Sequence, residues 1–326
     1  MNKRQILGAL AALTAGAFGA ALPAHGADEP WPSRPIRVIA PIPPGGTSDV
    51  IAREFAQGMA ARVGGTAIVD NRPGADGLIA TQAVARAAPD GYTLLFTLTQ
   101  HIQVPLQYKN LGYDPINDFV PLARIGAAAT VVVARSSLGI KSTGDLQKLA
   151  ATRQLTFATT ATGPQVIMEV FNKSAKLGML NVPYKGEPPV LTDLLGGQID
   201  LALLTVATAR QYVNNGQLAP LAVIAANRAA ALPNTPTFLE AGYKEVNWTG
   251  GWYGFLAPAK TPPAIVTRLV AAFKGSIEDP AIRNKMIGMD INLNWLDGPA
   301  FAPVMKQDMD NWAALVKRSG VVIEQR

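Results

Sequence analysis

The sequence contains no cysteine and only two histidines, His25 and His101, in 326 residues. Without cysteine, neither a disulfide framework nor a lipoprotein anchor is available. His25 falls in the N-terminal leader described below, so the mature chain keeps one imidazole. A single histidine cannot build a histidine-rich metal site. We therefore expect no metal and no cofactor.

Familiar catalytic motifs are missing as well. The chain has no G-x-S-x-G turn, no phosphate-binding G-x-x-x-x-G-K-[ST] loop and no G-x-G-x-x-G fingerprint. A nucleophile–histidine–acid triad would have to use His101. We favour His101 as a polar residue at the rim of a binding site or in a capped loop. A secreted α/β hydrolase or lyase stays as the alternative from a different class.

The N-terminus has the pattern of a secretory signal. Lys3 and Arg4 precede an uncharged apolar run from Ile6 to Leu22, with small residues at the expected cleavage site. The run is short and rich in alanine and glycine for a membrane span. We predict a signal peptide over residues 1–27, cleaved near Gly26 or Ala27, and a mature protein in the periplasm.

Charge gives little indication of a macromolecular partner. Removing Lys3 and Arg4 leaves 29 − 2 = 27 basic residues against 23 acidic ones, a net charge of +4. The basic residues are spread along the chain, which argues against nucleic-acid binding. The mature length of about 300 residues exceeds one ordinary core and favours two domains.

Apolar strand-like runs alternate with helical segments, which indicates an α/β fold with parallel sheets flanked by helices. The chain is expected to cross between domains near Gly126–Thr130 and Trp252–Leu256, where glycine-rich sequence meets apolar residues. The expected strands are Ile36–Ala40, Ala67–Val69, Thr93–Thr97, Val131–Ala134, Leu155–Ala158, Ile199–Leu204 and Leu221–Ala225. The expected helices are Ser48–Arg62, Leu78–Ala88, Val166–Ala175, Val190–Leu195, Thr208–Val213, Pro263–Ile277, Ala281–Ile287 and Pro299–Lys317.

A Pro-Gly-Gly turn follows the first of these strands and opens the first helix. Gly45 and Gly46 carry no Cβ atoms that would block a ligand, and Thr47 or Ser48 is suited to cap the helix. Amides without partners and the positive end of the helix dipole favour an anion. A tight strand–helix turn with an ordinary cap is the competing interpretation.

Six further motifs follow this turn along the chain. Together, in order and spacing, they resemble the Bug receptors, the extracytoplasmic solute-binding subunits of tripartite tricarboxylate transporters, over essentially the whole mature chain. The motifs are Val69–Gly77, Pro89–Leu94, Tyr113–Phe119, Val182–Gly186, Asp193–Gln198 and Leu232–Thr237.

The resemblance implies a two-lobed binding protein of the Venus-flytrap kind that is not an enzyme. It would close on a small carboxylate and deliver it to the permease subunits of the membrane transporter. Lobe I is then expected to comprise residues 28–126 and 253–326, and lobe II residues 127–252. We expect a monomer. A module that reports the ligand to a sensor kinase would use the same pocket and differ in its partner.

Two segments depart from the family pattern. The loop Phe157–Gln165 looks shorter and carries threonines in place of serine and glycine, but its hydroxyls and amides are still suited to a carboxylate. Leu204 stands where the family often has an acidic residue. The expected ligand-binding residues are Gly45, Gly46, Thr47, Ser48, Asp49, Thr97, Thr99, His101, Thr160, Thr162, Gly163, Tyr184, Thr205, Ala207 and Thr208.

This set contains hydroxyls and amides but few fixed charges. Such donors bind a carboxylate well and an ammonium poorly, because an ammonium needs acceptors. We therefore expect a carboxylate with an apolar or aromatic body, such as an aromatic or aliphatic dicarboxylate, in preference to an amino acid. Asp49 and Glu187 are the acids that would change this expectation if they pointed into the cleft.

Overall fold

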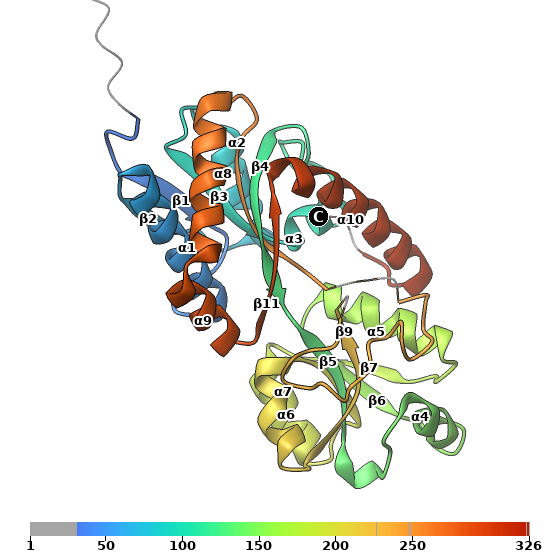
Figure 1. The fold of residues 1–326 in the computed structure, drawn as a ribbon. Helices are drawn as coiled ribbons and strands as arrows, with labels where there is room; N and C mark the ends of the chain where they lie inside the picture. Colours follow the sequence, from blue (N-terminus) through green and yellow to red (C-terminus); the bar gives the residue numbers. More distant parts are fainter. Residues whose placement is uncertain (1–30, 226, 247, 249, 324, 326) are drawn as a thin grey trace, which may run out of the picture.

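The chain folds into two α/β lobes joined at a narrow waist (Figure 1). The structure, a computed structural model, describes residues 31–225, 227–246, 248, 250–323 and 325. The predicted fold class is confirmed. The predicted signal peptide lies outside the described residues.

The first lobe contains a six-stranded sheet in the order β11-β4-β10-β3-β1-β2. One face is covered by helices α1, α8 and α9, and the other by α2, α3 and α10. The strands are β1 (Ile36–Ala40), β2 (Ala67–Asn71), β3 (Thr93–Leu98), β4 (Phe119–Ala128), β10 (Tyr253–Pro258) and β11 (Ile291–Asp297). The helices are α1 (Thr47–Val63), α2 (Leu78–Ala85), α3 (Gln100–Gln103), α8 (Pro263–Glu278), α9 (Pro280–Gly288) and α10 (Gly298–Ser319), with short 3-10 turns at Ala75–Gly77 and Val104–Leu106.

The second lobe contains a five-stranded sheet in the order β7-β6-β8-β5-β9. Helices α4 and α5 pack on one face, and α6 and α7 on the other. The strands are β5 (Thr130–Arg135), β6 (Thr156–Thr159), β7 (Leu180–Pro183), β8 (Leu201–Thr205) and β9 (Leu218–Ile224). The helices are α4 (Thr143–Ala150), α5 (Thr162–Ser174), α6 (Glu187–Leu195) and α7 (Val206–Asn214), with a 3-10 turn at Ser136–Leu138.

Strand direction corrects the expectation of parallel sheets. β1, β2 and β3 are parallel to one another, but β10 is antiparallel to β3 and β4, and β11 is antiparallel to β4. In the second lobe β5 is antiparallel to β8 and β9. The reason is the route of the chain. β4 runs out of the first lobe into β5, and β10 brings the chain back, so β5 and β10 enter their sheets from the waist.

Several elements were not expected from the sequence. Strand β4 contains Pro121 and Arg124, and the edge strand β11 alternates asparagine with apolar residues, so neither has a continuous apolar run. The short strand β7 lies at the edge of its sheet, and α4 has only eight residues. These elements depend on pairing and packing with distant segments more than on local pattern.

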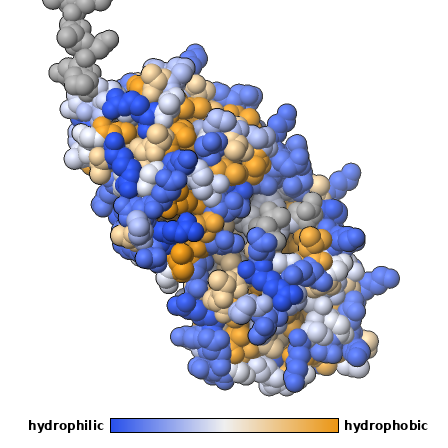
Figure 2. All heavy atoms as spheres, viewed as in Figure 1, coloured by the Kyte–Doolittle hydropathy of each residue, from blue (hydrophilic) through white to orange (hydrophobic). Residues whose placement is uncertain are grey.

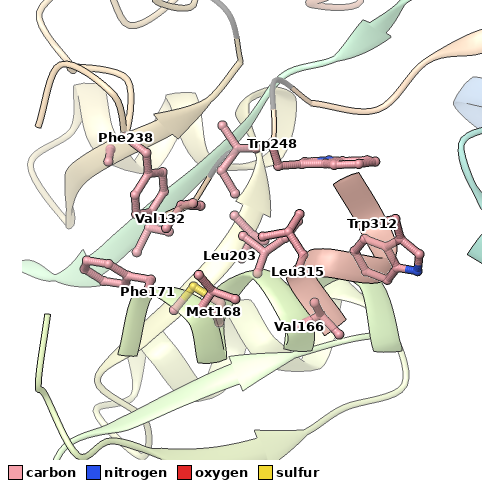
Figure 3. Close-up of a cluster of buried hydrophobic side chains, with 14 of the residues drawn as sticks. Val132, Val166, Met168, Phe171, Leu203, Phe238, Trp248, Trp312 and Leu315 are labelled. Carbon is pink, nitrogen blue, oxygen red and sulfur yellow. The ribbon is translucent and has the colours of Figure 1, made fainter. Parts of the chain in front are cut away.

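Helix α10 carries apolar packing from one lobe to the other. Near its start Phe301 is fully buried against the first sheet, and Trp252 meets it edge-on with ring centroids 4.9 Å apart. Toward its end, Trp312 and Leu315 lie against Trp248 and the α5 side chain Val166 (Figure 3). The rings of Trp248 and Trp312 are 5.6 Å apart. The two lobes therefore share one hydrophobic cluster beside the waist.

The face drawn in the space-filling view is mostly hydrophilic, with hydrophobic side chains in separate patches over both lobes (Figure 2). Within the described ranges, no helix has both the length and the apolarity that crossing a bilayer requires.

At Gly126 the backbones of β4 and β11 approach each other closely. Its φ is +151°, and a Cβ atom there would lie 2.2 Å from the carbonyl oxygen of Asn292. We expect Gly126→Ala to lower the free energy of unfolding by about 1–3 kcal/mol in denaturant titrations, because two backbones would have to separate.

Gly288→Ala is the matched control. Gly288 has no heavy atom within 4 Å of the added Cβ and lies in the last turn of α9, so its change should be neutral or slightly stabilising. Equal stabilities for the two variants would show that the β4–β11 contact relaxes freely.

Candidate functional site

A cavity of about 340 Å³ opens between the lobes at the waist. Both lobes and both crossing segments line it. The contributing residues are Asp76, Leu98, Thr99, Gln100, Gln103 and Gln107 from the first lobe, Ala127, Ala128 and Thr130 from the outgoing crossing, Ala161, Thr162, Gly163 and Pro164 from the start of α5, and Gly251, Trp252 and Tyr253 from the return.

The start of α5 supplies the cavity with hydrogen-bond donors. Ala161 is extended and serves as the N-cap residue, but it has no side chain to cap the helix. In the described part of the chain, the amides of Thr162 and Gly163 have no hydrogen-bond acceptor. First-turn amides of a helix have no partner within the helix itself and carry the positive end of its dipole. An anion in the cavity would satisfy both.

The facing wall is built from the segment after β3. The Thr99 amide donates to the carbonyl oxygen of Trp252 at 3.1 Å, and the Trp252 amide donates back to the Thr99 hydroxyl. Gly251 permits this approach, since a Cβ there would lie 2.7 Å from the Thr99 hydroxyl oxygen. The contact fixes the return segment against α3 and shapes one side of the cavity.

Three glutamines that were not among the expected ligand-binding residues line this wall. Gln100 donates to the carbonyl oxygen of Asp76 at 3.0 Å. The side chain of Gln103 reaches across to the second lobe, where a Cβ on Gly163 would lie 3.7 Å from it. Gln107 lies one turn further on. Their spacing of three and four residues directly after a strand was the signal that could have identified them.

The cavity has little fixed charge. Among the described residues that line it, the one acidic side chain is Asp76, and no arginine, lysine or histidine is present. Asp76 is exposed, and its carboxylate accepts a hydrogen bond from the Tyr108 hydroxyl at 3.0 Å. The start of α5 therefore carries its positive dipole end into a cavity whose described lining contains no basic side chain.

Asp49 does not line this cavity. Its buried carboxylate accepts hydrogen bonds from the Gly45 amide at 3.0 Å, from Arg53 at 2.9 Å and from Asn71 at 2.8 Å. Burial opposes ionisation, but these donors outweigh it and hold the pKa of Asp49 below its usual value. Asp49 thus ties the Pro-Gly-Gly turn to α1 and to the end of β2.

The rest of that turn lies at the surface. Gly45, Gly46 and Thr47 are exposed and do not line the cavity, whereas Ser48 is close enough to Tyr253, a residue of its wall, to oppose the rise in the pKa of Tyr253 that burial causes. Gly46 is the N-cap residue of α1 and has no side chain to cap it.

A second internal carboxylate occupies the start of α7. Glu187 accepts from the Thr205 amide at 2.7 Å and from the hydroxyls of Thr205 and Thr208. Both threonines are thereby engaged, and the exposed Ala207 between them does not line the cavity. Leu204 is fully buried in the core of the second lobe.

Of the other predicted residues, Thr99, Thr162 and Gly163 come together at the cavity. Thr97 is buried in the sheet and Thr160 is not part of the wall. The Tyr184 hydroxyl donates to Asp193 at 2.6 Å, and burial with this carboxylate raises the pKa of Tyr184 to about 12.

His101 lies behind the cavity wall. It is 2% exposed, packs edge-on against Phe119 and hydrogen-bonds the carbonyl oxygen of Pro115 through Nε2 at 2.8 Å. A neutral ring satisfies that bond as donor, and Nδ1 has no partner in the described chain. His101 is therefore a buried structural residue in this fold, and not the rim residue that the sequence led us to expect.

Two α/β lobes that enclose an open cavity between crossing strands define a solute-binding protein. The model of the tripartite tricarboxylate transporter family receptor matches residues 51–321, so the chain belongs to this family. The resemblance to the Bug receptors is confirmed, and membership makes the chain a receptor and not the hydrolase or lyase of the alternative.

Three comparisons illustrate the relationship. The chain is 29% identical to Protein BugT of Bordetella pertussis over 99% of this chain and 100% of BugT. The solved structure of the periplasmic binding protein BugD is 30% identical, with a TM-score of 0.72 over 91% of this chain and all of BugD. An R. palustris protein solved with adipate is 28% identical, with a TM-score of 0.74 over 90% of this chain and 99% of that protein.

Burial lowers the pKa of His101 to about 4, against an unfolded value of about 6.5, despite the opposing bond to Pro115. The unfolded chain therefore binds the proton first as pH falls. The stability that depends on a neutral His101 is complete above pH 6.5 and is lost as pH falls to 4, a change of roughly 3 kcal/mol.

We expect the difference in unfolding free energy between wild type and His101→Gln to shrink over this range, since the variant cannot titrate but keeps a donor for Pro115. Urea titrations at pH 7, 5.5 and 4.5 measure it. A difference that stays constant with pH would contradict the buried neutral state.

Proposed function

We propose that the protein captures a small carboxylate in the cavity between its lobes and delivers it to the permease of a tripartite tricarboxylate transporter. The observation that carries the proposal is the uncapped start of α5, whose Thr162 and Gly163 amides face a cavity without fixed positive charge. The adipate held by the R. palustris relative supports the same ligand class.

The binding residues that we propose are fewer than the sequence suggested. Thr99, Thr162 and Gly163 line the cavity, and Gln100 and Gln103 add amide groups. For the predicted residues of the Pro-Gly-Gly turn, we propose an indirect role through the contact of Ser48 with Tyr253. Asp49, Thr205 and Thr208 make bonds within their own lobes instead.

We further propose that residues 1–27 are removed on export and that the mature protein works as a monomer in the periplasm. Its moving lobes are residues 28–126 with 253–326, and residues 127–252. Supporting this division, the strands up to Ala128 and from Tyr253 belong to the first sheet and those between belong to the second. Closure would narrow the cavity between the start of α5 and the opposite wall.

Thr162→Asp tests the position of the carboxylate. The new side chain places a negative charge at the start of α5, where it favours the helix but repels an anion. Calorimetry with adipate should show at least a tenfold loss of affinity, about 1.4 kcal/mol, with an unchanged or higher melting temperature.

Thr143→Asp is the control, because Thr143 holds the same first position of α4 in the same lobe and does not line the cavity. Its affinity should equal that of wild type. Similar losses in both variants would refute a carboxylate site at α5.

The scarcity of acceptors generates a prediction of selectivity. An ammonium would find one carboxylate on the described wall, and Asp76 is exposed, where solvent screens it. We expect adipate to bind more tightly than 2-aminoadipate in competition calorimetry. Tighter binding of the amino acid would overturn the expected preference, and Asp76→Asn would then show whether Asp76 is responsible.

A further inference from the structure

A second cavity, of about 220 Å³, lies at the waist beside the first one. The two cavities share Ala127, Ala128 and Gly251 in their walls. The second cavity is otherwise lined by β4 and β11 of the first lobe, by the chain after β9 and by Gly250. It therefore touches both lobes, as the first cavity does.

The lining of this cavity differs in charge from that of the first. Its lining residues include one arginine, Arg124, and three asparagines, Asn227, Asn292 and Asn294. Amide groups offer N–H donors, and a guanidinium offers five in a fixed planar fork. The cavity thus combines one cationic group with several neutral donors.

The side chain of Arg124 lacks a hydrogen-bonding partner among the described residues. Its side chain is half-buried and its Nε is fully buried, yet in the described part of the chain Nε makes no hydrogen bond and the guanidinium has no carboxylate within 4.0 Å. For comparison, Arg135 in the second lobe forms an ion pair with Asp200 at 3.0 Å. A buried charge without a partner is costly, so Arg124 is a group that gains from an anion.

The nearest electrostatic counterpart is Asp308 on α10. Its charge favours ionised Arg124, while burial lowers the pKa of that arginine. The Asp308 carboxylate accepts a hydrogen bond from Nε1 of Trp252 at 3.1 Å. Asp308 attracts Arg124 electrostatically, but the two side chains form no ion pair within 4.0 Å.

We propose that the Arg124 cavity is an oxyanion site beside the cavity at the start of α5. A guanidinium pairs with two oxygens of a carboxylate or sulfate at once, the geometry in which arginine binds such groups most strongly. Asn292 and Asn294 supply further donors from the neighbouring strand. The cavity, of about 220 Å³, is smaller than a typical small-molecule pocket, and ions of the size of acetate and sulfate can enter it.

Occupancy of this site has a consequence for the lobes. Its walls come from both of them, so an anion there has different contacts at each lobe angle. A ligand with different affinity for two conformations shifts their populations, and it changes the affinity for the solute reciprocally.

Acetate and sulfate are the probes for the test, titrated by calorimetry and by melting temperature at constant ionic strength. Wild type should bind at least one of them saturably. Arg124→Gln should lose at least tenfold in affinity, and Asp308→Asn should bind several-fold more tightly, because a competing negative charge is removed while an acceptor for Trp252 stays. Arg318→Gln, at an exposed position of α10, controls for the change in net charge and should behave as wild type.

Thr162→Asp separates this site from the cleft. Probe binding that persists in Thr162→Asp but is lost in Arg124→Gln supports the proposal, whereas the reverse pattern, or equal losses in both, overturns it. Absence of saturable binding in wild type also overturns it. If Arg124→Gln does not fold, Asp308→Asn decides alone, and unchanged binding in that variant counts against the site. Adipate binding to the cleft is measured separately, so failure of one site leaves the other testable.

Discussion

The direction of the strands relative to the waist determines where chemistry can occur in this protein. β1 and β3 in the first lobe, and β6 and β8 in the second, all run toward the crossing. Helices that follow these strands begin there, so their free amides and positive dipole ends gather at one level of the molecule. β5 and β10 are antiparallel to their neighbours because the chain passes through the waist twice, and each of these strands runs away from it.

Not all of these helix starts are left for a ligand. At α1, Asp49 folds back on the Pro-Gly-Gly turn and takes the Gly45 amide. At α7, Glu187 takes the Thr205 amide and both threonine hydroxyls. The start of α5 has neither arrangement and opens into the cavity. Carboxylates of the protein itself therefore occupy the starts of α1 and α7, which shows that these helix starts hold a carboxylate well. The start of α5 stays available to a ligand.

Much of the fold follows from local pattern, because the buried strands and long helices carry continuous apolar runs or helical spacing. The direction of each strand within its sheet does not follow from local pattern, since an apolar run such as Val131–Ala134 fits a parallel or an antiparallel strand equally well. The site was predictable in part. Thr162 and Gly163 come just before a clear helical pattern, so their role could be predicted. The hydrogen bond between Glu187 and Thr205 could not, because the two residues are eighteen positions apart and no local pattern links them. His101 shows the same limit, because burial among Tyr113 and Phe119 is a tertiary property.

The contact between Trp312 and Trp248 means that the lobes are not joined by flexible strands alone. A change in lobe angle must either turn about this packed seam or separate it and expose two indole rings to water. If the seam separates, the conformations are unequal in energy before any solute arrives, because apolar surface is exposed to water. The affinity that a solute displays is then its intrinsic affinity scaled by the fraction of molecules already able to hold it. Residues of α10 that do not line the cavity would in this way set the concentration at which the receptor fills.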